Sequence, residues 1–135
     1  MPALIRRFHE AKETNLPEVK IWGTGTPRRE FLHVDDLAEA LLHLCELDNP
    51  PDLVNVGTGI DITIMELAQK IAEVVGYSGT IGTDLSKPDG TPVKCTNMAL
   101  MQSTGWKSKI SLDQGLKQAY QDFLKEVSEG LIREA

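Results

Sequence analysis

Apolar positions recur every three or four residues in several stretches of the sequence, a spacing that predicts amphipathic helices. These stretches lie at residues 2–13, 35–48, 64–75, 97–104 and 112–123. Between them, runs of β-branched and apolar residues predict short strands at 19–22, 29–34, 53–56 and 80–85. The expected order is helix, two strands, helix, strand, helix, strand and two helices, which predicts an α/β or α+β domain.

Polar residues at the predicted helix starts indicate where the helices begin. Three pairs have the spacing of a capping box: Thr63 with Glu66, Ser111 with Gln114, and Asp36 with Glu39. Gly76 is placed to close the third helix in a left-handed conformation. The second helix is expected to bury one apolar stripe: Leu37, Leu41, Leu44 and Cys45.

The composition changes this picture only by excluding classes of partner. The chain has 135 residues, 41% hydrophobic and 25% charged, as is usual for one globular domain. A net charge of −6 argues against nucleic acid, and no apolar run reaches the roughly 20 residues of a membrane-spanning helix. Cys45 and Cys95 have no metal or redox spacing, so we expect buried free thiols. We therefore expect a cytoplasmic protein that forms a single domain over residues 1–135.

Two Gly-x-Gly pairs resemble cofactor-binding loops, but their surroundings favour turns. Gly57-Thr58-Gly59 lies between a predicted strand and a predicted helix, where a dinucleotide-binding loop would lie. The third position of that fingerprint is Ile62, whose side chain would obstruct close packing of helix on strand. The pair Gly23 and Gly25 lies between two predicted strands, which predicts a hairpin.

Patterns for autonomous catalysis do not occur in the sequence. Neither tyrosine has a lysine four positions later, because Ile81 follows Tyr77 and Leu124 follows Tyr120 at that spacing. Three histidines share no metal-ligand spacing and are expected at the surface or in packing: His9, His33 and His43. We therefore predict no catalytic residue, no metal ligand and no cofactor-binding residue in this chain.

The stretch from Trp22 to Asp36 resembles the second lobe of extended short-chain dehydrogenase/reductases that act on nucleotide sugars. It has a Gly-x-Gly turn followed by Arg-Glu-Phe-Leu-His-Val-Asp-Asp, which fits the lobe's Arg-[Asp/Glu]-Phe-x-[His/Tyr]-Val-x-Asp pattern. Four other stretches narrow the resemblance to the GDP-L-fucose synthases, the NADP-dependent GDP-4-keto-6-deoxymannose epimerase/reductases: residues 2–11, 55–59, 86–92 and 100–112.

This resemblance implies a GDP-sugar site formed by Arg7, Trp22, Arg29 and Asp89. The two arginines would bind phosphates, Trp22 would form an apolar wall, and Asp89 would accept hydrogen bonds from hydroxyls or a base edge. Each residue also has a structural interpretation. These are, in order, a surface arginine on a helix, a hairpin aromatic, a strand-end ion pair and a turn-forming aspartate.

The resemblance covers nearly the whole chain but begins partway into the family's sequence. It therefore predicts the C-terminal, substrate-binding part of the enzyme, α+β-like and without a complete Rossmann domain. The cofactor loop and the catalytic residues would belong to a missing N-terminal half, so that NADP would bind only to the intact enzyme. The chain departs from the family's pattern at Val93 and at 95–97, which affects the contacts expected just after the turn at 86–90.

Partners follow from the same resemblance. We expect a GDP-sugar substrate, the missing cofactor-binding half, and self-association through exposed apolar surface on the first helix and at 23–31. Two other functions stay open. One is the substrate lobe of another nucleotide-sugar epimerase or dehydratase, and the other is a non-catalytic binding or interaction module that retains the fold.

Overall fold

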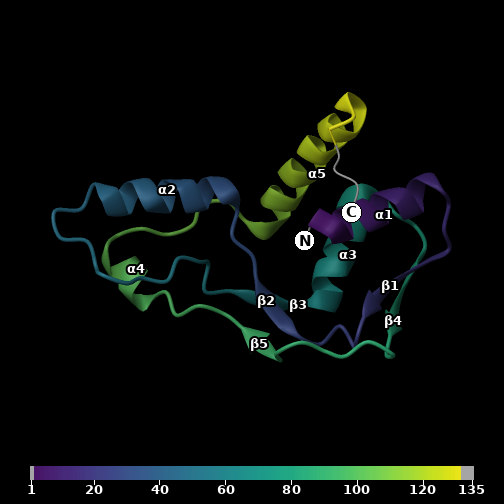
Figure 1. Ribbon diagram of the computed structural model, residues 1–135, viewed down its shortest axis with the longest axis horizontal. Coiled ribbons are helices and arrows are strands. Elements are labelled where there is room, and N and C mark those ends of the chain that lie inside the picture. The colour runs from purple at the N-terminus through teal and green to yellow at the C-terminus, as the bar shows by residue number, and fades with distance from the viewer. Residues whose placement is uncertain (1, 132–135) are drawn as a thin grey trace.

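The structure, a computed structural model, describes residues 2–131 and combines helices with short strands (Figure 1). The helices are α1 (Pro2–Glu13), α2 (Val34–Cys45), α3 (Ile64–Val75), α4 (Ala99–Ser103) and α5 (Leu112–Glu129). The strands are β1 (Glu18–Trp22), β2 (Arg28–Glu30), β3 (Asp61–Thr63), β4 (Thr80–Asp84) and β5 (Val93–Lys94). The expected mixture of helices and strands is confirmed. Within these residues no helix is both long and apolar enough to cross a membrane.

The strands form two small sheets rather than the expected hairpin. β1 pairs with β4 in parallel, while β2 pairs with β3 in antiparallel and with β5 in parallel. The hairpin prediction was wrong because the turn after β1 leads into the other sheet. Gly23 and Gly25 lie in this turn between the two sheets. Their φ angles of 71° and 76° are ones that glycine adopts readily.

The predicted strand at 53–56 was also wrong. The described residues contain no strand there, and the third strand begins at Asp61 instead. Val54 and Val56 pack against a hydrophobic cluster below α2, without a neighbouring strand to pair with.

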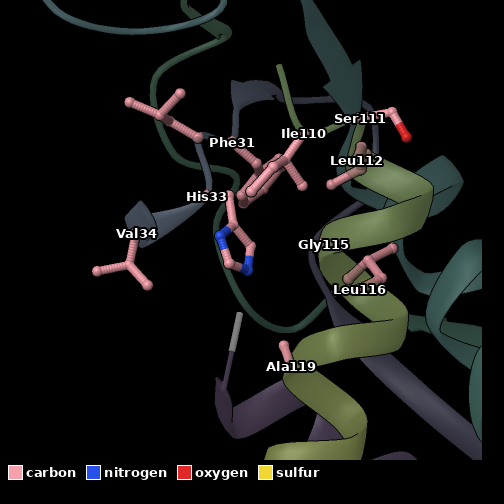
Figure 2. Close-up of a pocket in the computed structure, with 10 residues that line it drawn as sticks. Phe31, His33, Val34, Ile110, Ser111, Leu112, Gly115, Leu116 and Ala119 are labelled. Carbon is pink, nitrogen blue, oxygen red and sulfur yellow. The ribbon is translucent and has the colours of Figure 1, made fainter. Parts of the chain in front are cut away.

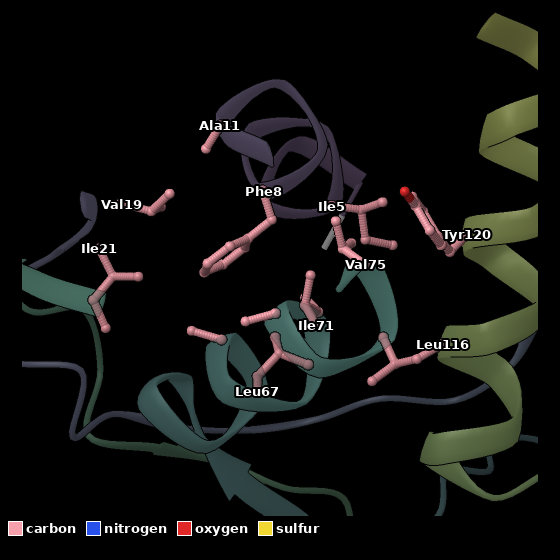
Figure 3. Close-up of a cluster of buried hydrophobic side chains, with 12 residues drawn as sticks. Ile5, Phe8, Ala11, Val19, Ile21, Leu67, Ile71, Val75, Leu116 and Tyr120 are labelled. Carbon is pink, nitrogen blue, oxygen red and sulfur yellow. The ribbon is translucent and has the colours of Figure 1, made fainter. Parts of the chain in front are cut away.

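The main hydrophobic core lies between α1, α3, β1 and the first half of α5 (Figure 3). Phe8 and Ile71 lie at its centre and are almost completely buried. The other members come from the same elements: Ile5, Ala11, Val19, Ile21, Leu67, Ala68, Ala72, Val75, Leu116 and Tyr120. This core fixes α1 and β1 against each other, and two of the proposed site residues lie on these elements.

A second, smaller cluster lies between α2 and α4, which extend away from the main core (Figure 1). It contains Ala40, Met98, Met101 and Trp106. The predicted inward stripe of α2 was wrong at three of its four positions, because Leu37, Leu41 and Cys45 are exposed. The inward positions are Asp36 and Ala40, one turn apart, with the partly buried Leu44 one turn further on. Cys45 and Cys95 are free thiols as expected, but both are exposed, not buried.

Two of the three predicted capping boxes are confirmed. They begin α3 at Thr63 and α5 at Ser111, and Gly76 closes α3 with a φ of 75°. The box at Asp36 was wrong because α2 begins earlier, where the side chain of His33 accepts a hydrogen bond from the amide of Asp35. The buried carboxylate of Asp36 instead accepts bonds from the amides of Lys109 and Ile110, which holds the approach to α5 against α2.

Candidate functional site

Asp89 joins two loops at the end of the parallel pair β1–β4. Its carboxylate accepts hydrogen bonds from the amide of Thr24 at 2.9 Å and from the hydroxyl of Thr24 at 2.7 Å. The loop approaches so closely that a β-carbon on Gly23 would lie 2.1 Å from Oδ1 of Asp89. The glycine after β1 is therefore required for this approach as well as for the turn.

Trp22 ends β1 and is 68% exposed, an unusual position for so large an apolar side chain. The ammonium of Lys87 lies 5.7 Å from the centroid of its ring, within the range of a cation–π contact. Trp22 therefore lies beside the segment of residues 84–89, which ends at Asp89. An exposed aromatic face next to a cation can receive an apolar or planar group of a ligand.

Arg29 lies on β2 and contacts the chain just beyond that segment, at Thr91. Its Nη1 donates to the carbonyl oxygens of Arg28 and Thr91, at 2.7 Å in each case. Within residues 2–131 no protein acceptor is found for its Nε and Nη2, which leaves a pair of donors suited to a phosphate or carboxylate. The neighbouring Arg28 is committed differently, because its Nε donates to Asp61 at 2.7 Å.

An open hollow of about 580 Å³ lies beside Arg29. Arg29 and Lys94 provide two cationic side chains at its wall, and Cys95 and Thr96 continue the wall beyond Lys94. The lysine was not singled out from the sequence. Its place on β5, in parallel register with Arg29, depends on a pairing that local patterns do not show.

Arg7 lies apart from this group. It projects from α1, and its guanidinium donates to the backbone carbonyl of Lys20 on β1. It lines a different hollow, together with Glu10, Thr14 and Lys20. The structure thus brings Trp22, Arg29 and Asp89 to one loop, residues 84–92, and holds Arg7 at the middle of β1.

Glu30 organises the floor of the hollow and was missed by the sequence interpretation. One carboxylate oxygen accepts bonds from the amides of Thr58 and Gly59, and the other accepts from the amide and hydroxyl of Thr96 at 2.7 Å. Burial raises the pKa of this carboxyl, but the hydrogen bonds from Thr96, Gly59 and Thr58 outweigh it and lower the pKa overall. The sequence did contain a signal for Glu30. It is an acidic residue on a short predicted strand, directly after Arg29, the candidate phosphate-binding arginine.

The Gly57-Thr58-Gly59 turn does not fit a dinucleotide. A cofactor loop offers free amides to the pyrophosphate at a helix N-terminus, whereas the amides of Thr58 and Gly59 here donate to the Glu30 carboxylate. A diphosphate would also meet that negative charge. Moreover, β3 separates the turn from the start of α3. These contacts support the interpretation of this segment as a structural turn.

The histidines take part in packing or surface contacts. His9 contacts the hydroxyl of Tyr120 at 3.1 Å, His33 begins α2, and His43 contacts Thr104 at 3.0 Å. Across residues 2–131 no group of three histidine, cysteine or acidic side chains could hold a metal ion.

Comparisons with known proteins show what this chain is similar to. Residues 1–57 match the family model described as the NAD dependent epimerase/dehydratase family. The GDP-L-fucose synthase of Escherichia coli K12 is 53% identical over 134 residues, which cover 93% of this chain and 42% of that protein. The chain thus spans less than half the length of that relative.

Solved structures share the fold over nearly the whole chain. The GDP-mannoheptose C4 reductase MlghC of Campylobacter jejuni, solved with NADP bound, is 37% identical with a TM-score of 0.82. The match covers 91% of this chain and 44% of that one. A UDP-glucose 4-epimerase of Thermotoga maritima, solved with UDP-glucose, is 28% identical with a TM-score of 0.76, over 92% of this chain and 40% of the epimerase.

Proposed function

This chain is related to the GDP-L-fucose synthases, and from that premise we propose that it forms the GDP-sugar-binding part of such an enzyme. The four contacts are those of Arg7, Trp22, Arg29 and Asp89. The proposed substrate is GDP-4-keto-6-deoxymannose, which an epimerase/reductase converts by epimerisation and by hydride transfer from NADPH. In this proposal the groups that bind NADP and move protons belong to polypeptide that this chain does not contain.

The observation that carries the proposal is the meeting of three of these residues at residues 84–92. Asp89 fixes this loop to the turn after β1, Arg29 binds the carbonyl of Thr91, and Trp22 lies exposed beside Lys87. The two unused donor groups of Arg29 can bind two oxygens of a phosphate at once. The chain's role would be to hold the diphosphate and orient the sugar. Holding the substrate in this way converts a bimolecular step into an effectively unimolecular one.

Removing the Arg29 guanidinium is expected to abolish most GDP binding by this chain. A charge-assisted hydrogen bond contributes about 1.5–3 kcal/mol, so Arg29→Ala should weaken the affinity roughly 10- to 100-fold. Binding is measured by titration calorimetry or by amide NMR shifts. Arg6→Ala is the control, since Arg6 pairs with Glu10 on α1 and lies outside the proposed contacts. Equal losses in both variants would contradict the role of Arg29.

The base preference separates this proposal from a general nucleotide-sugar lobe. GDP is expected to shift the amides around Arg29 and Asp89 more than UDP or inorganic phosphate does. Equal responses to GDP and UDP would favour another nucleotide-sugar enzyme, in line with the similarity to a UDP-glucose 4-epimerase. Shifts confined to other parts of the surface would mean that the proposed site is wrong.

The chain on its own is expected not to oxidise NADPH in the presence of the keto-sugar substrate. It has no Tyr-x-x-x-Lys pair, and its Gly57–Gly59 turn donates to Glu30. Absorbance at the NADPH band tests this in protein purified away from host reductases. Consumption that rises in proportion to the concentration of this chain would overturn the assignment of chemistry to other polypeptide.

A further inference from the structure

Lys87 places a positive charge against the exposed ring of Trp22. Its ammonium lies 5.7 Å from the ring centroid, and the tryptophan is 68% exposed. A cation–π contact at an exposed site is weak, so the ammonium can leave the ring at little cost. Lys87 can therefore exchange this contact for one with a ligand that stacks on the indole.

No acidic side chain among residues 2–131 forms an ion pair with Lys87. Asp84, three positions earlier, is engaged by Ser86 instead. Its Oδ1 accepts hydrogen bonds from the amide of Ser86 at 3.1 Å and from the hydroxyl of Ser86 at 2.6 Å. These bonds lower the pKa of Asp84 most, and the charge of Lys87 adds to the effect. The ammonium of Lys87 thus keeps its donors for a ligand.

Asp89, two positions further on, is committed to holding the loop. One carboxylate oxygen accepts from the amide of Thr24 and the other from the Thr24 hydroxyl. The backbone of Gly23 closes over the same carboxylate, because a β-carbon there would collide with Oδ1. A carboxylate turned towards its own loop is poorly placed to select a base. Selection then falls to a neighbouring side chain with unused donors.

The same loop reaches from Trp22 to the proposed phosphate-binding arginine. A β-carbon on Gly90 would lie 3.0 Å from Nη2 of Arg29, so this donor group lies directly against the loop. Lys87 and Gly90 are three residues apart, which places their Cα atoms no more than about 11 Å from each other. A nucleotide with its phosphates at Arg29 can therefore extend its base to the ring of Trp22.

The apolar hollow at the start of α5 is a poor alternative place for a base. Figure 2 shows the side chains that surround it, among them Phe31, Ile110 and Leu116. No lysine or arginine lines this hollow, and none of the four proposed substrate contacts does. It offers apolar contact without a cation for a carbonyl oxygen.

We propose that Lys87 selects the base that stacks on Trp22, by donating a hydrogen bond to an oxo group of a purine. Guanine presents O6 and N7 as acceptors, and a lysine ammonium can donate to either. Adenine has an amino group in place of O6, and the hydrogens of that group would face the ammonium. This inference rests on the proposed function and assigns base selection within that site to Lys87.

Three purine nucleotides test the role of Lys87: GDP, ADP and inosine diphosphate. Inosine diphosphate keeps O6 but lacks the 2-amino group of guanine, so it separates the two edges of the base. Binding is followed through the fluorescence of Trp22, because the chain's other tryptophan, Trp106, is buried. GDP and inosine diphosphate are expected to bind alike, and ADP about five- to tenfold more weakly.

Lys87→Met removes the cation but keeps an unbranched apolar side chain. In this variant the affinities for the three nucleotides should become equal within about twofold, because the oxo group loses its donor. Lys87→Arg keeps a cation with donors and should retain the preference for the oxo purines. Lys107→Met is the matched control, since Lys107 is also exposed, lies after α4 and gives the same change in net charge.

Two results would overturn the inference. A preference for GDP that inosine diphosphate does not share would assign selection to the 2-amino group, and hence to an acceptor such as Asp89. A discrimination against ADP that persists in Lys87→Met would show that another group selects the base. Equal weakening of all three nucleotides in that variant would make Lys87 a phosphate contact and also reject base selection.

The inference and the proposed function fail in different ways. GDP binding that Arg29→Ala removes, but that ADP matches in the wild type, would reject the role of Lys87 alone. No binding of any of the three nucleotides would reject the proposed function, and the role of Lys87 with it.

Discussion

Replacing Phe8 by alanine is expected to lower the free energy of unfolding by about 3–5 kcal/mol, a large part of the roughly 5–15 kcal/mol typical of a domain. Phe8 is fully buried in the main core, and its ring lies edge-on to Tyr77 with 5.4 Å between centroids. Truncation would leave a cavity between α1 and α3 that neighbouring side chains fill only in part. Urea unfolding followed by circular dichroism measures the loss as a lower midpoint with an unchanged slope.

The matched control is Leu85→Ala, which removes an apolar side chain from a site that is 72% exposed. Its effect should stay within about 0.5 kcal/mol because no cavity forms. Similar losses for both variants would show that α1 does not pack on α3 as described.

Glu30→Gln is expected to destabilise the chain by about 2 kcal/mol, because an amide nitrogen cannot accept the bonds that one carboxylate oxygen now accepts. Either the two bonds from Thr96 or those from Thr58 and Gly59 would lose their acceptor. This variant keeps the size of the side chain, so cavity formation does not contribute. Urea unfolding at neutral pH measures the difference.

Acid should remove this difference between the two proteins. The pKa of Glu30 is lowered from 4.5 on folding, so the unfolded chain binds its proton more tightly than the folded chain does. The stabilisation from the charged form is therefore complete above pH 4.5 and is lost as the pH falls through the folded pKa. Urea midpoints of the wild type and Glu30→Gln should converge once the pH is below the lowered pKa of Glu30. A gap that stays constant from neutral pH until the chain unfolds in acid would contradict this assignment.

The helices could be predicted because their signals are local. The caps of α3 and α5 each lie within four residues, and Gly76 closes α3 directly after its last turn. Such hydrogen bonds depend on the sequence spacing alone. The three residues at the 84–92 loop were named from a family resemblance, and the structure shows how Asp89 and Gly23 bring them together.

The errors concern residues whose partners lie far along the chain. The local sequence indicates that Asp36 is a capping residue. Its actual partners are the amides of Lys109 and Ile110, which lie more than 70 residues further along the chain. Leu37 and Leu41 read as core because periodicity shows that a face is apolar, not whether another element covers it. Glu30 was passed over for the same reason, since its donors at Thr58 and Thr96 come from two distant loops.

The parallel pairing of β1 with β4 has a consequence for synthesis of the chain. Glu18 pairs with Thr80, so β1 leaves the ribosome long before its partner strand exists. α3 is likewise synthesised long after α1. Ile5 and Phe8 therefore lack their packing partners on α3 until residues 64–75 emerge from the ribosome. At roughly 5–20 residues per second, this interval lasts several seconds in the cell. Throughout that time the apolar face of α1 is available to chaperones, and to misassembly.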